Sequence, residues 1–520
     1  MDSLFRSPAV VASVAALLLW IAWKMLLEPS VLPDLPVVGL DRSQWFAWPR
    51  TYYRSFHRHR ELYKEANLKY LSHGKPCIMP ELNNNRVIVP STWGQWLVDQ
   101  PSDTLSSLQR AKDLLQTKHT FPSPKMADRT HHVHVLKMDL TRKLSSLSGE
   151  IWSELGTSLD QHWGTDTEEW KQVNLFQTMM RVVTRTSHRV FVGEPMCANE
   201  EYLNLCTAFA VDVPVSGMVI HMVPKLLQPL LAPLITLPNR YHNRKIRQML
   251  RPEILRRLRM AERGDDDVPN DFLQWYITYA RKSLEPEEST PKFVSDRIAT
   301  INFAAIHTST FTSVNAIFDI ISSPDTATIL SDIRTEVQSV MPVADERWSK
   351  TAVQSMVKTD AILRESMRYS SFMSSALDRT VVAEQGITTP SGLHIKPGNV
   401  IAVPAFPIHS DPNNYSDPTT FLPHRFLRPQ ESDTQSEDRK VGSTNAVDTS
   451  LTFLSFGHGR HNCPGRFFAV NELKLLLAYV ALKYDIEPLE RRPEHVAFGS
   501  TMTPDANVVV RVRRRKDHGV

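Results

Sequence analysis

The chain has 520 residues, 42% of them hydrophobic and 22% charged, which is typical of a globular protein that buries a large core. Its net charge of +4 is small for this length, so we expect no nucleic-acid partner. Four cysteines, none of them in a C-x-x-C pair, are too few for a disulfide scaffold and argue against a zinc ribbon or a dithiol redox site.

An apolar stretch near the N-terminus runs from Ala9 to Leu27 and is interrupted only by Ser13 and Lys24. It is long enough to cross a bilayer, which takes roughly 20 helical residues. Because no small-residue cleavage site follows it, a membrane anchor is favoured over a signal peptide. We therefore expect residues 1–28 to anchor the chain, the proline-rich residues 29–40 to form a hinge, and residues 41–520 to form one catalytic body.

The following segments alternate between helical and extended patterns. Residues 60–74 read as an amphipathic helix closed by Gly74, and residues 77–91 read as a hairpin that turns at Asn83, Asn84 and Asn85. Helical periodicity dominates from Leu136 to Met341, and short β-type runs occupy residues 386–408. The predicted fold class is mainly α, with a small sheet near each end of the chain.

Residues 221–238 are apolar but contain four prolines, so they cannot form a membrane-spanning helix. Two interpretations stay open for this segment. It is either a buried irregular stretch or a loop that dips into the lipid headgroup region.

The stretch "SFGHGRHNCPGRFFAVNEL" carries one cysteine, Cys463, in a glycine-rich basic loop. A thiolate ligand is favoured by nearby positive charge, here from Arg460, His461 and Arg466, and by the N-terminus of the helix that follows. Glycines also let the backbone approach a flat cofactor closely. A single cysteine in such a loop suits one axial haem ligand better than a four-thiolate site. The alternative is a buried structural cysteine in a glycine turn.

The pattern Phe456-Gly457-x-Gly459-Arg460-His461-x-Cys463-x-Gly465 resembles the haem-binding loop of the cytochrome P-450 monooxygenases. The resemblance implies the cytochrome P-450 fold, a large helical domain with a small β-rich part. It also implies haem b with Cys463 as the axial ligand to iron, and Phe456, Gly457 and Gly465 against the cofactor.

Two further features are similar to conserved parts of this family. Glu365 and Arg368 lie three residues apart on one predicted helix, as in the family's Glu-x-x-Arg pair, and Arg425 in "FLPHRF" matches its third partner. This resemblance implies a structural ion-pair cluster that braces the haem side of the core. Such a cluster is stabilising only when it is complete.

"NFAAIHTST" resembles the family's central helix. The resemblance implies that Thr308 takes part in oxygen activation and proton delivery. His307 replaces the family's usual acid, and we expect it either to relay protons or only to pack. For "AIHT" alone, without Cys463, a core helix with a satisfied histidine would be the preferred interpretation.

The remaining site expectations also follow from the resemblance. His461 and Arg379 match the family's haem-propionate contacts, and Lys137 is a candidate for a third, although no tryptophan accompanies it. Residues expected to face the substrate are Phe303, Ile306, Phe372, Met373 and Ser374.

The predicted activity is monooxygenation of a lipophilic small molecule, with electrons passing from NADPH through a separate cytochrome P-450 reductase, since no flavin or nicotinamide motif is found. The stretches "FAAIHTST" and "CPGRFF", together with the anchor, are similar to those of filamentous-fungal enzymes that modify terpenoids, including diterpenoids, indole-diterpenes and meroterpenoids. A polyketide or alkaloid substrate is an alternative.

The anchor implies the endoplasmic reticulum membrane, with the catalytic domain in the cytosol. Two rival functions stay open, a reductase-independent haem-thiolate isomerase or dehydratase and a non-catalytic haem carrier.

Overall fold

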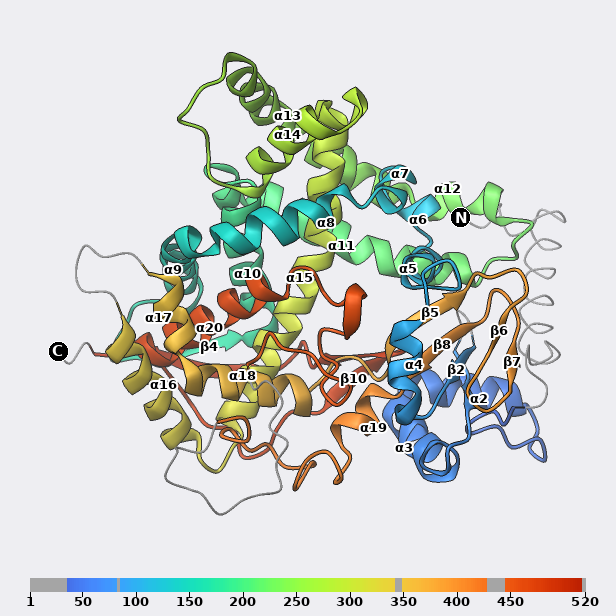
Figure 1. Cartoon of the computed structure of the whole chain (residues 1–520). Coiled ribbons are helices and arrows are strands. Elements are labelled where there is room, and N and C mark those ends of the chain that lie inside the picture. Colours follow the sequence, from blue (N-terminus) through green and yellow to red (C-terminus); the bar gives the residue numbers. More distant parts are fainter. Residues whose placement is uncertain (1–34, 82–84, 342–347, 428–444, 517–520) are drawn as a thin grey trace, which may run out of the picture.

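The computed structural model of the chain describes residues 35–81, 85–341, 348–427 and 445–516. The predicted anchor and most of the predicted hinge lie outside these ranges. Helices fill most of the molecule, and a smaller sheet-rich part lies to one side of them (Figure 1). The prediction of a mainly α fold with a small β-rich part is confirmed.

The sheet-rich part gathers strands from both ends of the chain. Its five-stranded sheet has the order β1-β2-β8-β5-β3. β1 and β2 pair antiparallel as the predicted hairpin, whereas β2 and β8 run parallel. The strands are β1 Cys77–Met79, β2 Arg86–Ile88, β3 Leu105–Ser106, β5 Ala376–Val381 and β8 Val400–Val403, and β6 Ile387–Thr388 pairs with β7 His394–Ile395 beside them. Helices α2 Ala47–His57 and α3 His59–Lys69 cover this part (Figure 1).

The predicted amphipathic helix over residues 60–74 is present as α3 and a short 3-10 turn. The turn ends at Gly74, whose φ of +73° is a left-handed conformation that glycine adopts without steric cost. Of the predicted hairpin turn, Asn83 and Asn84 lie outside the described residues.

After β2 the chain enters short helices, the first of which, α4, precedes β3, and it continues with long helices. The short helices are α4 Gly94–Asp99, α5 Ser107–Leu115, α6 Thr117–Thr120, α7 Lys125–Asp128 and α8 His131–Val135, with a π-helical turn at Leu136–Leu140. The long ones are α9 Thr141–Trp163, α10 Leu175–Phe191, α11 Glu200–His221, α13 Leu237–Arg263, α14 Phe272–Ser283, α15 Pro291–Ile321, α16 Thr326–Val340 and α18 Val357–Tyr369; α12 Gln228–Ile235, α17 Lys350–Ser355 and α19 Ala405–His409 are short.

Helix α15 runs through the middle of the helical part and packs against α10, α11, α13, α18 and α20 (Figure 1). Its start is fixed by Thr290, whose side-chain oxygen accepts a hydrogen bond from the N–H of Phe293, and by Pro291 in the first turn. This placement carries Thr308 to the centre of the molecule.

The segment 221–238 is more helical than either sequence interpretation allowed. α11 ends at His221, α12 spans Gln228–Ile235 and α13 starts at Leu237. Pro229 and Pro238 lie in the first turn of their helices, where the missing N–H costs little. The buried interpretation is wrong, because the side chains of Leu226, Leu230, Leu234 and Leu237 are exposed.

One helix in the described part of the chain, α11, is long and apolar enough to cross a membrane, and 44% of its apolar window is buried in protein. It packs against α13 and α15 and carries core residues such as Phe209 and Val213, as a core helix does.

The C-terminal part returns to the core. α20 Arg466–Lys483 follows the Cys463 loop directly. β4 Lys171–Asn174, β12 Val509–Arg514 and β9 Tyr484–Ile486 form a three-stranded antiparallel sheet, and β10 His495–Phe498 pairs with β11 Thr501–Pro504.

Candidate active site

The loop that presents Cys463 is closed by backbone hydrogen bonds. The N–H of Cys463 donates to the carbonyl oxygen of Phe456 at 2.9 Å, and the N–H of Gly457 donates to Leu454 at 2.8 Å. Gly457 and Gly459 have φ values of +67° and +76°, which favour glycine. The Arg466 guanidinium donates to the carbonyl oxygen of Cys463 at 3.0 Å and holds the loop on the start of α20.

Opposing influences act on the Cys463 thiol. Burial raises its pKa, while the backbone N–H groups of Gly465 and Arg466 and the Arg466 guanidinium act to lower it. The nearby N–H groups and the Arg466 guanidinium therefore favour the thiolate, whereas burial removes the water that would solvate an unpaired negative charge. Such a thiolate is stable when it binds a cation.

Two cavities meet at Cys463. They have volumes of about 280 Å³ and 240 Å³, and we call them cavity 1 and cavity 2. Both are lined by Cys463 and Ala469 at the start of α20 and by Ala304, Thr308 and Ser309 on α15. α15 and the segment from Cys463 to Ala469 thus line both cavities, which adjoin at these shared residues.

The α15 residues that line both cavities are small, namely Ala304, Thr308 and Ser309. Ala304 and Thr308 are one helical turn apart and open to both cavities, and the Thr308 hydroxyl donates to the carbonyl oxygen of Ala304 at 2.9 Å. His307 is outside the lining of both cavities. Its ring lies 5.9 Å from that of Phe311, and burial lowers its pKa to about 4.

Four basic side chains converge beside the loop. The guanidinium groups of Arg379, on β5, and of Arg460 both donate to the carbonyl oxygen of Gln100. Burial, followed by the positive charges of Arg379, Arg460 and Lys137, lowers the pKa of His461. None of the four forms an ion pair with a carboxylate in the part of the chain that the structure describes. The cluster, brought together from three segments of the chain, is suited to a ligand that carries carboxylate groups.

Glu365, Arg368 and Arg425 form one buried ion-pair cluster. Arg368 donates to both carboxylate oxygens of Glu365, at 2.7 Å and 2.8 Å, and Nε of Arg425 donates to the same two oxygens at 3.0 Å each. Arg368 also donates to the carbonyl oxygens of His409 and Pro418 at 2.7 Å. The cluster therefore ties α18 to the loops that lead toward Cys463.

Comparisons with known proteins agree with this geometry. The cytochrome P450 family model matches residues 91–510. The chain belongs to the cytochrome P450 family.

The relatives of this cytochrome P450 include fungal enzymes. It is 31% identical over 495 residues to the cytochrome P450 monooxygenase pbrC of Penicillium brasilianum, covering 93% of this chain and 92% of that protein. It is 34% identical to cytochrome P450 monooxygenase 151 of Postia placenta, covering 80% and 82%. The solved structure of retinoic acid-bound cyanobacterial CYP120A1 shares the fold, with a TM-score of 0.65 at 17% identity over 94% of this chain and 100% of that one. The protein is thus an oxidoreductase of the monooxygenase type.

The family implies haem with a cysteine thiolate ligand, and the residues of this site fit that group. A Cβ placed on Gly465 would meet nothing within 4 Å, so the loop leaves open space beside the sulfur. Cys463 would hold the iron, and the cluster of Arg379, Arg460, His461 and Lys137 would neutralise the two propionates. When bound, haem would supply an iron centre for oxygen activation, and the Cys463 thiolate would increase its electron density.

The structure places only some of the residues expected to face the substrate in the walls of these cavities. Phe303 lines cavity 1, and Phe372 and Met373 line cavity 2. Ile306 and Ser374 are buried outside the lining of both cavities. Ile306 packs in the main core, because its side chain projects from another face of α15 than those of Ala304 and Thr308.

Sequence reasoning missed the segment that covers cavity 1. Residues of α5 to α8 line it, among them Leu108, Lys112, Phe121 and His132. These short helices lack a long hydrophobic period. The local signal that could have identified them is the series of helix starts and helix ends over residues 106–130. That signal indicates several short helices but not which part of the protein they cover.

Proposed function

We propose that this cytochrome P450 oxidises a lipophilic small molecule in fungal secondary metabolism, most specifically a terpenoid such as a diterpenoid, an indole-diterpene or a meroterpenoid. The observation that carries the proposal is the mainly apolar lining of cavity 1 above Cys463. A hydrocarbon-rich skeleton gains free energy by filling such a lining, and the few polar groups set its orientation.

In this proposal Thr308 holds and passes a proton at its Oγ1 atom. The hydroxyl now donates to Ala304, and rotation about χ1 would let it donate into the cavity instead. The small side chain of Ala304 leaves room above the sulfur. His307 is uncharged near neutral pH, so it would serve in a relay only as a neutral donor and acceptor.

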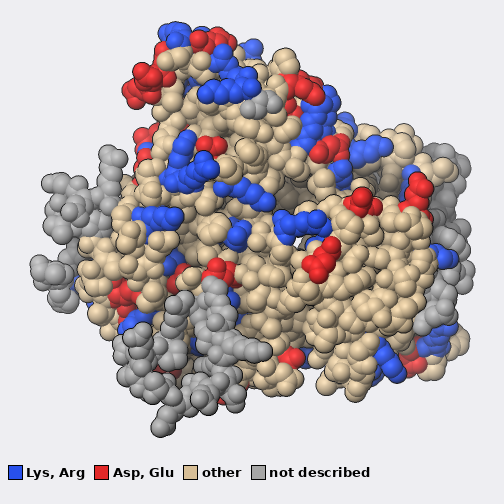
Figure 2. Space-filling model, viewed as in Figure 1, with Lys and Arg blue, Asp and Glu red and all other residues tan. Residues whose placement is uncertain are grey.

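Electrons would come from NADPH through a separate cytochrome P450 reductase. Figure 2 shows Lys and Arg side chains across the middle of the face that Figure 1 shows to carry α8, α9 and α20. Lys137, Arg142 and Arg460 are exposed in this region. A basic surface on the cysteine side of the molecule suits an acidic electron donor, because complementary charge speeds encounter.

The membrane is the second proposed partner, at the endoplasmic reticulum with the body in the cytosol. Support comes from α12 and its flanks, where Leu226 is 91% exposed and Leu230 is 70% exposed. An exposed row of leucines on one short helix suits the interfacial region of a bilayer.

The deciding experiment reconstitutes the full-length enzyme with a fungal cytochrome P450 reductase, NADPH and a panel of terpenes. A hydroxylated product that requires NADPH and reductase is the expected result. A product that forms without either would instead identify a haem-thiolate isomerase or dehydratase. Haem binding without turnover of any terpene, polyketide or alkaloid tested would favour the non-catalytic carrier.

A further inference from the structure

Lys112 on α5 is the one Asp, Glu, Lys or Arg among the described residues that line cavity 1. The rest of the lining is apolar or uncharged, since His132 has its pKa lowered to about 3 by burial and by Arg297. A cation is costly beside apolar surface unless it meets a partner. Its presence in this wall therefore calls for an anion.

The present partner of Lys112 is Asp128 at the end of α7, which its ammonium group contacts directly. Asp128 lies outside the lining of the cavity and its side chain is 55% exposed, whereas that of Lys112 is 26% exposed. The neighbouring Asp113 faces β5, where its carboxylate accepts a hydrogen bond from Thr380 at 3.4 Å. Lys112 thus lines the cavity and contacts one solvent-exposed carboxylate that lies outside the lining.

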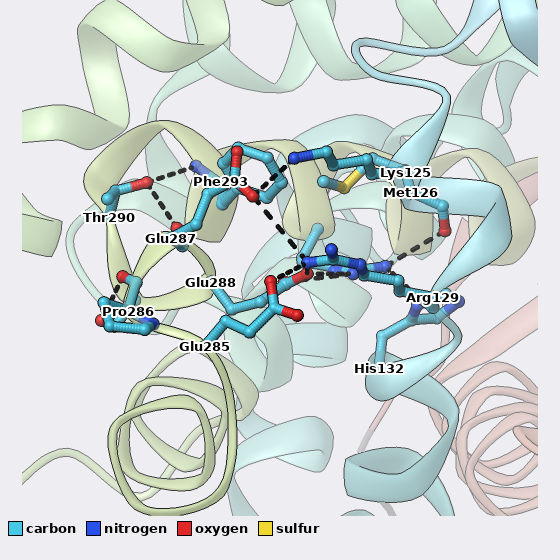
Figure 3. Close-up of polar contacts among 12 residues, drawn as sticks. Lys125, Met126, Arg129, His132, Glu285, Pro286, Glu287, Glu288, Thr290 and Phe293 are labelled. Carbon is cyan, nitrogen blue, oxygen red and sulfur yellow. Dashed lines mark hydrogen bonds and ion pairs between the residues drawn. The ribbon is translucent and has the colours of Figure 1, made fainter.

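Residues 125–132, several of which line cavity 1, are held by ion pairs to residues 285–297. Figure 3 shows Arg129 beside Glu285 and Glu288, and Arg129 pairs with Glu285 at 2.7 Å. Arg297 pairs with Glu288 at 3.1 Å, both side chains are fully buried, and Arg297 also donates to the carbonyl oxygen of Met126 at 3.1 Å. Lys125 pairs with Glu287 at 2.7 Å. These contacts hold the segment in place in addition to the Lys112–Asp128 pair.

We propose that Lys112 binds a carboxylate of the substrate, so that the enzyme oxidises a lipophilic carboxylic acid at a carbon remote from the acid group. The inference rests on the proposed function, because it names the substrate class of the same cavity. The substrate carboxylate takes the place of Asp128 on the ammonium group, while its skeleton fills the apolar lining.

The test is spectral titration of the full-length, haem-loaded enzyme with two acid–alcohol pairs, abietic acid with abietinol and palmitic acid with 1-hexadecanol. The wild type should bind one acid more tightly than its alcohol. Lys112→Gln should weaken that acid about 10-fold or more and leave the alcohol within 2-fold, because only the charged hydrogen bond is lost. Lys112→Arg should keep the preference for the acid.

Two further variants distinguish recognition of the substrate by Lys112 from a purely structural role of the Lys112–Asp128 ion pair. Asp128→Asn removes the competing carboxylate and should tighten acid binding a few-fold. Lys118→Gln, an exposed lysine on α6 outside the lining, should change nothing. Failure of both acids to bind the wild type, or equal weakening of acid and alcohol in Lys112→Gln or Asp128→Asn, would overturn the proposal. A carbon monoxide difference spectrum of each reduced protein reports the haem thiolate separately, so failure of the proposed function itself would be recognised.

Discussion

The N–H of Cys463 and the carbonyl oxygen of Phe456 are joined by a 2.9 Å hydrogen bond, which closes the loop around Gly457 and Gly459. A Cβ on Gly459 would stand 2.5 Å from Cγ1 of Val98, whereas one on Gly457 would find its nearest atom at 3.9 Å. Both have positive φ, so an alanine at either position costs about 1 kcal/mol in backbone strain.

Gly459→Ala should therefore lower the haem content of the purified protein well below that of Gly457→Ala. Gly457→Ala serves as the matched control, because it carries the strain without the collision. The ratio of haem absorbance to protein concentration measures both. Equal losses in the two variants would show that strain, and not contact with α4, limits the loop.

Glu365→Ala should prevent stable haem incorporation. It leaves the guanidinium groups of Arg368 and Arg425 buried without their shared carboxylate, at a cost of about 3–5 kcal/mol. Glu487→Ala, which breaks an exposed pair with Arg511, is the control and should keep full haem content. The cluster would not be a brace if Glu365→Ala retained wild-type haem.

Thr308→Ala should slow product formation by ~10²-fold or more, the usual contribution of a positioned proton donor, and divert NADPH oxidation to hydrogen peroxide. Carbon monoxide should still bind the reduced enzyme. Thr278→Ala on α14 removes the same kind of hydroxyl bond to the preceding turn and should be silent. Unchanged coupling in Thr308→Ala would remove this residue from oxygen activation and favour the reductase-independent isomerase.

His307→Phe keeps a ring beside Phe311 and removes both ring nitrogens. Coupling of NADPH oxidation to product should fall as it does for Thr308→Ala if the histidine relays protons. Coupling equal to that of the wild type would assign His307 to packing alone. The measurement is the ratio of product formed to NADPH consumed.

Glu472→Gln on α20 should stabilise the enzyme at pH 8. Burial raises the pKa of Glu472 from 4.5 to about 8, and one carboxylate oxygen accepts a hydrogen bond from Ser187. The folded state holds this proton more tightly than the unfolded state. The contribution of Glu472 to the free energy of unfolding is therefore fully present below pH 4.5, falls as the pH rises and is lost by about pH 8.

The stability gained by Glu472→Gln should thus be near zero at pH 4.5 and grow to about 3–5 kcal/mol by pH 8. Urea unfolding at several pH values measures it, with Glu487→Gln as the exposed control. A constant difference between variant and wild type across this range would contradict the assignment.

Deleting residues 1–28 should release the protein from membranes only partly, because α12 still binds lipid weakly. Adding Leu230→Ser and Leu234→Ser should complete the release, since both side chains are exposed. Leu68→Ser on α3 alters an equally exposed leucine elsewhere and should not increase the release of the truncated protein from membranes. Sedimentation with vesicles measures binding, and a truncated protein already free in solution would disprove contact through α12.

The sequence alone determined the features whose parts lie close together in the chain. The Cys463 loop, the Glu365–Arg368 spacing and the Ala304–Thr308 face each fit within one loop or two helical turns. There, backbone geometry fixes which side chains share a face. The same local rules predicted α3, the glycine that ends the turn after it, and the β1–β2 hairpin.

The tertiary structure decided what depends on contacts between distant segments. Lys137 and Arg379 share no local pattern with the Cys463 loop, and only packing brings them beside Arg460 and His461. The place of Lys112 in the wall of cavity 1 depends in the same way on the packing of α5 against the body. Ile306 was expected to face the substrate because of its neighbours in the chain. It packs in the main core instead, because side-chain direction within α15 follows the packing of the whole helix. Burial and long-range charge are collective properties of the folded chain, and no short pattern in the sequence encodes them.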